Sequence, residues 1–352
     1  MFINRSKPFV KQTILAGFLA GCFLIVFPVV KQAIAGPPDG PIKLNVAINN
    51  YKSAQYDEAI RLFSEIVESE AADIEHRKDA LRYLGRCYVA KRQNNRARNT
   101  LKALLAFEPP VVNFDPDRES PPFMRVYYEA RKDQSNGSYQ LEHVDDGIKT
   151  IAVIDFQNSS VDHKKKYDPL EKGFADILIN RLNGTTQLKV VERDRIQWIL
   201  NELEIQNKYE MQGAIKAGEQ LGVHAVILGS YIVVKKEIWL SARLVKVATS
   251  EVLLTQDIKG KVDDFFELTE KLSKKIAAAI DSQIKHESAS IRKDSNSLEA
   301  MLSYSEGLVY LEKAEYERAY QKFIEALDHD PRYDRARMKA ESVRHLVAYT
   351  EG

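Results

Sequence analysis

The segment from residue 149 to residue 284 alternates apolar runs of strand length with stretches of amphipathic helix pattern. The runs 150–156 and 188–191 are apolar and rich in β-branched residues, and the segment 170–182 places its apolar residues on one helical face. The second run leads into another such helix, for which Asp194 is the expected N-cap. A strand that is repeatedly followed by a helix predicts an α/β domain.

The second half of this segment predicts antiparallel strands. The apolar run 225–234 is separated by only 235–237 from residues 238–247, where apolar and polar side chains alternate. This is the pattern of a hairpin with a half-buried second strand. A further strand at 251–258 and a long helix at 264–284 complete the domain. Together the two halves predict a mixed sheet with packed helices.

Four pieces of this segment occur in an order that resembles the CsgG family, whose namesake is the curli secretion channel subunit of the Gram-negative outer membrane. The pieces are Ile151–Phe156, Gly173–Leu178, Val190–Ile196 with Glu202 on the following helix, and Leu221–Gly229. The resemblance implies a role in secretion or assembly at the cell envelope and a possible homo-oligomer. It also implies that Glu192, Arg193 and Glu202 are structural residues of the family motif.

Channel members of this family carry additional membrane-spanning hairpins inserted into the domain. A spanning strand needs about 9–11 residues. The connections at 235–237 and 260–263 leave no room for such hairpins. The resemblance therefore indicates the soluble domain of the family, with the channel subunit as the alternative.

Residues 42–133 are similar to tetratricopeptide repeats. Small and large apolar residues fall on the spacing that lets two antiparallel helices pack closely. In the better-matched unit these are Leu84, Gly85, Tyr88, Ala97, Leu101, Leu104 and Pro109. A further helix, with Ser120 as its expected N-cap and proline in its first turn, follows to about Lys132.

A third unit lies at 298–349, after a polar linker at 285–297. It matches the same repeat spacing at Gly307, Tyr310, Tyr316, Ala319, Phe323, Ala326 and Pro331. One isolated repeat is too small to be stable, because repeats bury their apolar faces on their neighbours. The unit is therefore expected to dock on the central domain, to stack on the first repeats, or to await a partner. The whole chain is accordingly expected to be an α+β, multidomain protein, with all-α repeats on both sides of the α/β domain.

Repeats of this kind present the first helix of each pair to a concave binding face. The expected protein-binding side chains on that face are Asn50, Arg86, Lys91, Tyr304 and Glu312. The small residues Gly85, Ala97, Gly307 and Ala319 are expected to be structural. Cys87 is expected to be a small core residue and not a nucleophile.

The first 35 residues carry an export signal. Arg5, Lys7 and Lys11 precede the uncharged apolar run 13–30, with no acidic residue before Asp39. Three fates are compatible with this segment: signal peptidase cleavage after Ala35, lipidation at Cys22 within Leu-Ala-Gly-Cys, and retention of 13–30 as an anchor. The first favours a periplasmic protein, possibly associated with the outer membrane, and the last an inner-membrane anchor.

The charge balance and the polar motifs favour a non-enzymatic protein. Lys and Arg total 51 against 50 acidic residues, so no overall field attracts nucleic acid. No metal-type histidine pair, phosphate-binding glycine loop or nucleophile motif is present in the sequence, so neither a metal, a cofactor nor a catalytic residue is predicted. The best acid–base candidates are Asp155 and Glu192, at strand ends. We expect Glu192 and Arg193 to cap and pair locally, and the basic cluster 163–166 to be a solvated loop.

The sequence thus predicts an exported envelope scaffold or assembly factor that acts by contact with other envelope proteins and meets the membrane at most through its N-terminal segment. A secretion channel subunit and an enzyme with a site at Asp155 and Glu192 are the alternatives.

The fate of the N-terminus can be measured by mass spectrometry of the mature protein. We expect the first residue to be Gly36, because Ala33 and Ala35 have the small-residue spacing of signal peptidase cleavage. A diacylated or triacylated Cys22 would instead establish a lipoprotein, and an intact N-terminus would establish the anchor.

Overall fold

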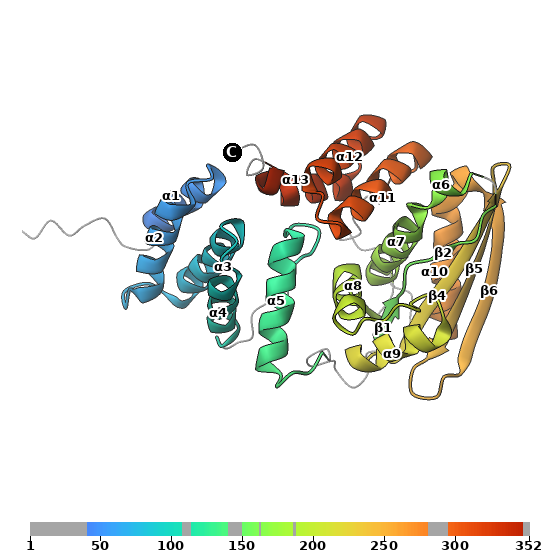
Figure 1. Cartoon of the computed structure of the whole chain (residues 1–352), viewed down its shortest axis with the longest axis horizontal. Coiled ribbons are helices and arrows are strands. Elements are labelled where there is room, and N and C mark those ends of the chain that lie inside the picture. Colours follow the sequence, from blue (N-terminus) through green and yellow to red (C-terminus); the bar gives the residue numbers. More distant parts are fainter. Residues whose placement is uncertain are drawn as a thin grey trace, which may run out of the picture. The chain divides into compact units, whose positions relative to one another are not determined.

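The computed structural model describes residues 41–107, 114–139, 150–161, 163–185, 188–280 and 295–347 (Figure 1). The expected export segment 1–35 with Cys22, Pro109 of the repeat pattern and most of the linker 285–297 lie outside the described residues. Within the described ranges, no helix is both long and apolar enough to cross a membrane.

Six strands form one mixed sheet, as predicted. The strands are β1 Thr150–Val153, β2 Gln157–Asn158, β3 Lys189–Val190, β4 Ala225–Val234, β5 Glu237–Lys246 and β6 Val252–Lys261. Their order is β3-β1-β4-β5-β6, with β2 also pairing with β4. β1 is parallel to both β3 and β4, whereas β5 is antiparallel to β4 and to β6. The predicted hairpin is therefore confirmed.

Helices cover both faces of the sheet. Because successive side chains of a strand point to opposite faces, Ile151 and Val153 of β1 pack in one core while Ala152 and Ile154 pack in another. The first core contains α7 (Leu170–Thr185) and α10 (Phe265–Ala279), and the second contains α8 (Arg193–Glu202) and α9 (Met211–Leu221). The chain thus leaves β1 for β3 through α7 and returns to β4 through α8 and α9. The carboxyl end of β1 lies where these two crossovers diverge.

Three local predictions in this domain were wrong. Helix α8 begins at Arg193 with Glu192 at the N-cap position, so Asp194 lies inside its first turn. The last helix begins one residue later than predicted, after a short 3-10 turn at Val262–Asp264, and ends at Ala279. The basic cluster expected in a loop forms a single exposed helical turn, α6 (Lys164–Tyr167).

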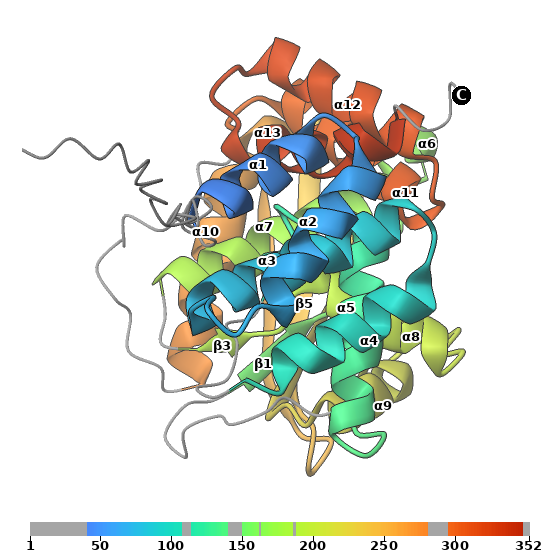
Figure 2. The ribbon, with the colours of Figure 1, turned by 90° about the vertical axis from the view of Figure 1, so that its left-hand side faces the viewer.

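The N-terminal segment forms five successive helices, each packed on the next (Figure 2). They are α1 Pro41–Lys52, α2 Tyr56–Glu68, α3 Ile74–Ala90, α4 Asn94–Leu105 and α5 Pro121–Gln134. Ser120 occupies the N-cap position of α5, as predicted, although its side chain makes no capping hydrogen bond. Cys87 is fully buried, and this burial raises the pKa of its thiol to about 12, which confirms a core residue.

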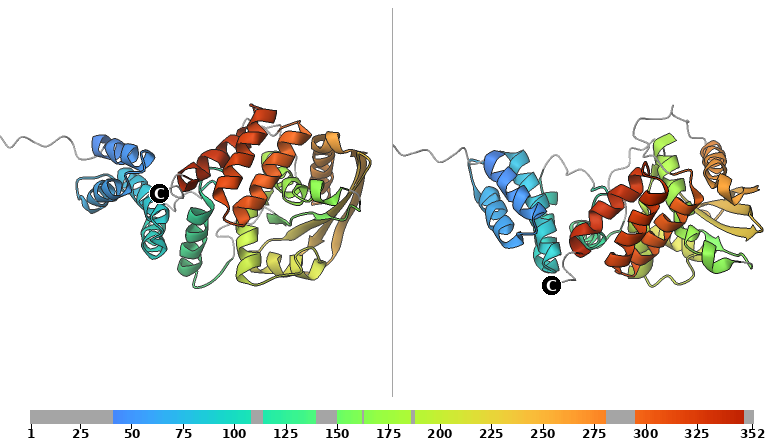
Figure 3. Two further views of the ribbon diagram at one scale, coloured as in Figure 1. Left: turned by 45° about the horizontal axis from the view of Figure 1, so that its top comes forward. Right: turned by 90° about the horizontal axis from the view of Figure 1, so that it is seen from above.

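The C-terminal segment forms α11 Leu298–Glu312, α12 Tyr316–His329 and α13 Asp334–Val347 (Figure 3). Leu298 and Met301 of α11 belong to the same core as α7. A Cβ atom at Gly173 of α7 would lie 2.1 Å from Ser305 Oγ and 2.7 Å from Met301 Cε. The absence of a side chain at Gly173 therefore lets α11 lie directly against α7. Of the three arrangements considered for this segment, docking on the central domain is observed, and α13 in addition contacts the N-terminal segment through Asp117 and Pro116.

Gly307 is expected to be the least replaceable glycine of the N-terminal and C-terminal helical segments. A Cβ atom there would lie 2.4 Å from Cε1 of Phe323, whose ring is fully buried. We expect Gly307→Ala to lower the free energy of unfolding by up to about 2 kcal/mol, since overpacking costs about 1–3 kcal/mol and the gain in helix propensity recovers about 1 kcal/mol. Urea denaturation measures this change.

Gly85→Ala is the matched control. Its Cβ atom would lie 3.1 Å from Leu101 and 3.4 Å from Phe123, both longer than the 2.4 Å contact at Gly307, so stability should stay within about 1 kcal/mol of the parent chain. Equal losses in both variants would contradict the proposed role of the Gly307–Phe323 contact.

Candidate functional site

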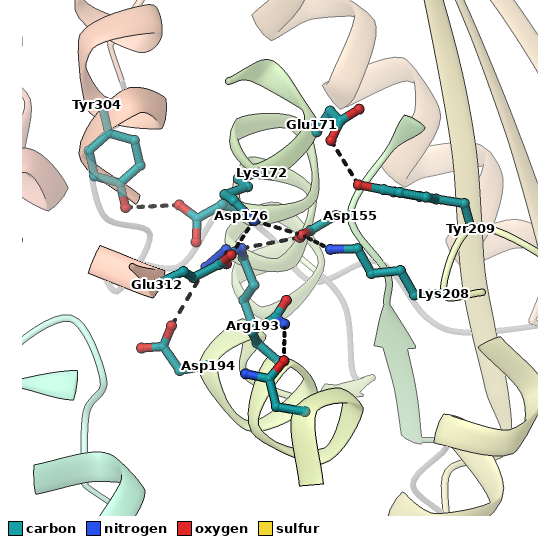
Figure 4. A network of polar contacts seen from close by, with 12 residues as sticks. Asp155, Glu171, Lys172, Asp176, Arg193, Asp194, Lys208, Tyr209, Tyr304 and Glu312 are labelled. Atoms are coloured by element: carbon teal, nitrogen blue, oxygen red, sulfur yellow. Dashed lines mark hydrogen bonds and ion pairs between the residues drawn. The ribbon is translucent and has the colours of Figure 1, made fainter. Parts of the chain in front are cut away.

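Asp155 is the centre of a buried polar network at the carboxyl end of β1 (Figure 4). Lys208 Nζ lies 2.9 Å from its Oδ2 atom and Lys172 Nζ lies 3.2 Å from the same oxygen. Arg193 Nε lies 3.2 Å from its Oδ1 atom. The side chains of Asp155 and Arg193 are only 5% and 6% exposed. Three cations from different segments thus converge on one carboxylate.

The fold places these groups where two crossovers diverge. Asp155 follows β1, Lys172 lies in the first turn of α7 on one side of the sheet, and Arg193 begins α8 on the other. Lys208 comes from the segment between α8 and α9. In open α/β sheets, ligands bind outside the carboxyl ends of the strands at such a switch point. Here side chains of the chain itself occupy that position.

The cations keep Asp155 ionised. Burial by itself would raise its pKa, but Arg193, Lys172 and Lys208 outweigh this effect and hold the pKa well below its usual range. The neighbouring carboxylates Glu312 and Asp155 likewise outweigh the burial of Arg193 and raise its pKa. A carboxylate held in this way is a weak base, so its arrangement favours a structural role over proton transfer.

The C-terminal helix α11 contributes a second carboxylate to the cluster. Glu312, the last residue of α11, pairs with both Arg193 and Lys172. Its side chain remains 24% exposed, so it closes the cluster at the protein surface. Without Glu312, Asp155 would be left as the carboxylate opposite Lys172, Arg193 and Lys208.

A second group of ion pairs continues the network into α13 and the segment before α5. Arg335 lies 2.6 Å from Asp176 and 3.3 Å from Asp117. Lys339 Nζ lies 3.3 Å from Asp194 and 3.4 Å from Asp117, and it donates a 3.0 Å hydrogen bond to the Pro116 carbonyl. The network therefore joins the N-terminal helical segment, the central domain and the C-terminal helices.

Two predicted binding residues belong to this network. The expectation that Tyr304 is exposed is wrong: its ring is fully buried, and its hydroxyl donates a 2.9 Å hydrogen bond to Asp176. The carboxylate of Glu312 is engaged by Arg193 and Lys172 instead of being free for a partner. Both residues fix α11 to the central domain.

The other three predicted binding residues lie in the N-terminal helices. Asn50 is half-buried and donates a hydrogen bond to the Val46 carbonyl. Lys91 pairs with Asp57 at the surface. Arg86 makes a two-pronged pair with the buried Glu119, so we expect reversal of its charge to destabilise the fold. The binding role of these residues remains a prediction.

Two of the family-motif residues, Arg193 and Glu202, form ion pairs with residues that are distant in the sequence. Arg193 does pair locally, with Asp194 at 3.7 Å, but it also pairs with the distant Asp155 and Glu312. Glu192 occupies the N-cap position, but its exposed side chain makes no capping hydrogen bond. Glu202 lies 3.4 Å from Lys132 and so connects α8 with α5. Together Arg193 and Glu202 make α8 one element that contacts both flanking segments, while α7 also contacts the C-terminal helices.

Sequence reasoning missed most members of the network, which are Asp117, Lys172, Asp176, Lys208, Arg335 and Lys339. A signal was present for the last two. Arg335 and Lys339 are one helical turn apart and adjoin the buried Ala336 and Ala340. Charged side chains at core positions of a helix are rarely buried unless they are paired.

The network is expected to depend on the charge of Asp155. Asp155→Asn leaves three cations with one fewer carboxylate, and we expect a loss of about 3–5 kcal/mol in the free energy of unfolding. Urea denaturation at neutral pH measures it. Asp257→Asn, on the exposed β6, is the matched control and should change stability by less than about 0.5 kcal/mol.

The loss of stability caused by Asp155→Asn should also depend on pH. The folded pKa of Asp155 is below the unfolded value of about 3.9, so its contribution is present above that value and is lost as the pH falls towards the folded pKa. The difference between the parent and Asp155→Asn should therefore shrink in acid. Equal stability of the two at pH 7 would contradict the assigned role.

Comparisons with known proteins show what the central domain is similar to. Residues 137–237 match the family model described as curli production assembly/transport component CsgG. All four sequence pieces quoted for the resemblance fall within that range, whereas the match ends where β5 begins.

Two further comparisons add little. Among solved structures, the chain is similar to the C-terminal domain of LpoB from Salmonella enterica, at 12% identity and a TM-score of 0.24, over 33% of this chain and 87% of that one. No curated protein matches the chain. Residues 137–237 of this chain are thus similar to the CsgG family.

Proposed function

We propose that this protein is a non-enzymatic scaffold or assembly factor of the cell envelope, which acts by holding other envelope proteins. The family description of residues 137–237 names curli production, assembly and transport, and this supports a role in the assembly or secretion of a surface structure. The export pattern of residues 1–35 supports a periplasmic location, possibly at the outer membrane.

The observation that carries the proposal is the polar network around Asp155. It fills the switch point of the sheet with internal side chains and ties helices from both flanking segments to the central domain. Because the chain's own helices close the switch point of the sheet, the surfaces of the three segments keep a constant arrangement relative to one another. That is the property required of a scaffold.

Acid–base catalysis by Asp155 and Glu192 is less well supported. Asp155 is ionised and neutralised by three cations. Burial of part of its carboxyl group, and then the carboxylates of Asp117 and Asp194, raise the pKa of Glu192, but the residue is exposed and solvent therefore weakens this shift. No group of acidic, histidine or cysteine side chains suited to a metal ion occurs in the described part of the chain.

A channel subunit is the second candidate, because the family match favours it. The connections in which channel members would carry additional hairpins are short here: Lys235 and Lys236 alone join β4 to β5, and one 3-10 turn joins β6 to α10. These lengths favour the scaffold. A homo-oligomer remains compatible with either function.

The proposal can be tested by photo-crosslinking in intact cells. A photoreactive residue at position 50 or 91 of the full chain should give discrete crosslinks to an envelope protein, because these positions lie on the helical face expected to bind partners. Mass spectrometry of the crosslinked bands identifies the partner. The matched control is position 259, an exposed lysine on the edge strand β6, which should give no such band.

Either of two results would contradict the proposal. The first is the absence of a discrete crosslink from positions 50 and 91 in cells where the protein is folded. The second is ion conductance by residues 36–352 in a planar bilayer, which would establish the channel subunit instead.

A further inference from the structure

Large apolar side chains are exposed at one end of the central sheet, where β4 turns into β5. Ile232 of β4 pairs with Trp239 of β5, so both side chains point to the same face, and they are 41% and 39% exposed. Val234, near the end of β4, is exposed on that face as well. Val161 is 90% exposed, and the hydroxyl of the preceding serine accepts a hydrogen bond from the backbone of β4. These side chains therefore gather at one end of the strands.

The helices that cover this face lie over the other half of the strands. Val226 of β4 and Val245 of β5 share a core with α8 and α9. Toward the β4–β5 turn the face remains open in the part of the chain that the structure describes, as the exposure of Ile232 and Trp239 shows. Exposed apolar patches bordered by polar residues commonly mark an interaction surface.

A dense group of lysines borders the apolar side chains. We call residues 161–166, 232–239 and 259–264 the sheet tip: it contains seven lysines against four acidic residues, a net charge of +3, whereas the whole chain carries +1. Lys259 lies 3.0 Å from Glu237 and 4.6 Å from the centroid of the Trp239 ring. The remaining lysines are exposed and form no ion pair with a residue that the structure describes; they are Lys164, Lys165, Lys166, Lys235, Lys236 and Lys261.

The three pieces of the sheet tip are held together by hydrogen bonds. Asn158 of β2 donates a 3.1 Å bond to the Lys164 carbonyl, which fixes α6 at the same end of the sheet as the β4–β5 turn (Figure 1). The Val262 amide donates a 2.8 Å bond to the Lys236 carbonyl, which joins the end of β6 to the same turn. The lysines thus belong to one surface.

The β4–β5 turn keeps its two lysines in spite of backbone strain. Lys235 and Lys236 have φ angles of 56° and 110°. A two-residue hairpin turn needs positive φ at both positions, so Asn-Gly is the favoured sequence there, and a lysine is disfavoured because its Cβ atom is crowded. Strain of this kind points to a function. We therefore attribute the choice of residues to the charge that they place at the tip.

The residue types favour a lipid surface over a protein partner. The sheet tip contains no arginine, and its permanently charged cations are all lysines. Protein–protein interfaces are enriched in arginine and depleted in lysine. In contrast, the lysine stem lies along an apolar surface while its ammonium group reaches the phosphates of a bilayer, and tryptophan prefers the boundary between headgroups and acyl chains. Exposed apolar side chains bordered by unpaired lysines are complementary to an anionic bilayer.

We propose that the sheet tip docks on the surface of a bilayer that contains anionic phospholipids. Ile232, Val234 and Trp239 enter the headgroup region, and the lysines of α6 and of the β4–β5 turn contact the lipid phosphates. This inference goes beyond the scaffold function, and it goes beyond the expectation that the chain meets the membrane at most through its N-terminal segment.

The test uses the full chain with Trp198→Phe, which keeps an aromatic ring in that core and leaves Trp239 as the single tryptophan of the two. The protein is reconstituted into two types of vesicle with the same share of brominated phosphatidylcholine, whose acyl chains quench tryptophan. The remaining lipid is phosphatidylglycerol in one type and plain phosphatidylcholine in the other. Because the N-terminal segment is the same in both samples, a difference in the quenching of Trp239 reports on the sheet tip.

We expect Trp239 to be quenched roughly twofold more strongly in the vesicles that contain phosphatidylglycerol. The excess should disappear in about 1 M salt, where the Debye length is only about 3 Å. Ile232→Thr keeps a β-branched residue in β4 but removes apolar surface, so it should reduce the quenching in both vesicle types.

The double variant Lys235→Asn, Lys236→Gly separates lipid binding from folding. It removes two charges and gives the turn the residues that its backbone favours, so the melting temperature should be unchanged or raised. The excess quenching with phosphatidylglycerol should nevertheless fall by about half or more. Lys216→Gln with Lys246→Gln is the matched control: it removes two exposed lysines from α9 and from the opposite end of β5, and it should leave the quenching unchanged.

Three results in the vesicles would overturn the proposal: no quenching of Trp239, equal quenching with and without phosphatidylglycerol, or unchanged quenching in the Lys235→Asn, Lys236→Gly variant. A discrete protein crosslink from a photoreactive residue at position 232 in intact cells would also overturn it, because a partner protein would then cover the tip in place of lipid. Crosslinks from positions 50 and 91 do not depend on these results. The failure of the lipid contact is thus distinguishable from the failure of the scaffold.

Discussion

The buried Arg193 guanidinium is the constraint on which the arrangement of this protein depends. A guanidinium with 6% exposure must be paired, and besides the neighbouring Asp194 its partners are Asp155, which follows β1, and Glu312 at the end of α11, 119 residues later in the chain. The net contribution of such a buried pair to stability is small, whereas leaving one partner unpaired is costly. The network therefore contributes little net stability. It disfavours every other placement of α11 against the sheet, because buried charges would then be left without partners. Asp176 and Asp194 extend this penalty to α13 through Arg335 and Lys339.

Apolar packing brings the same segments together. α11 shares a core with α7, and the N-terminal helices α3 to α5 share a core with the α8 and α9 face of the sheet. Gly173 permits the close approach on one side, and Trp198 with Tyr128 forms the aromatic contact on the other. The flanking helices are therefore not independent modules joined by linkers. An α-helical pair leaves one apolar face unburied, and here the central domain buries it.

This joining has a functional consequence. The switch point of the sheet, which is a ligand site in many α/β proteins, is closed by charged side chains, while a new cavity appears where α5, α8 and the α11–α12 turn meet. The surface available to a partner is thus composed of residues from all three segments. The similarity to the CsgG family model over residues 137–237 includes α8, one wall of this cavity, but neither α5 nor the α11–α12 turn.

The helices and strands whose formation depends on residues close in the sequence were predictable. The strands β1, β4 and β5, the hairpin, most helices and the CsgG-family pieces follow from apolar periodicity and turn chemistry, which act over a few residues. The burial of Tyr304, the engagement of Glu312 and the long-range pairing of Arg193 were not predictable, because they depend on which distant helix covers α7. No local pattern distinguishes a tyrosine on a solvent-facing helix from one that meets Asp176 across an interface. The sequence by itself thus determined the elements and the similarity of the central segment to a known family. Only the tertiary structure decided which charged groups meet, because long-range pairing depends on the packing of whole helices.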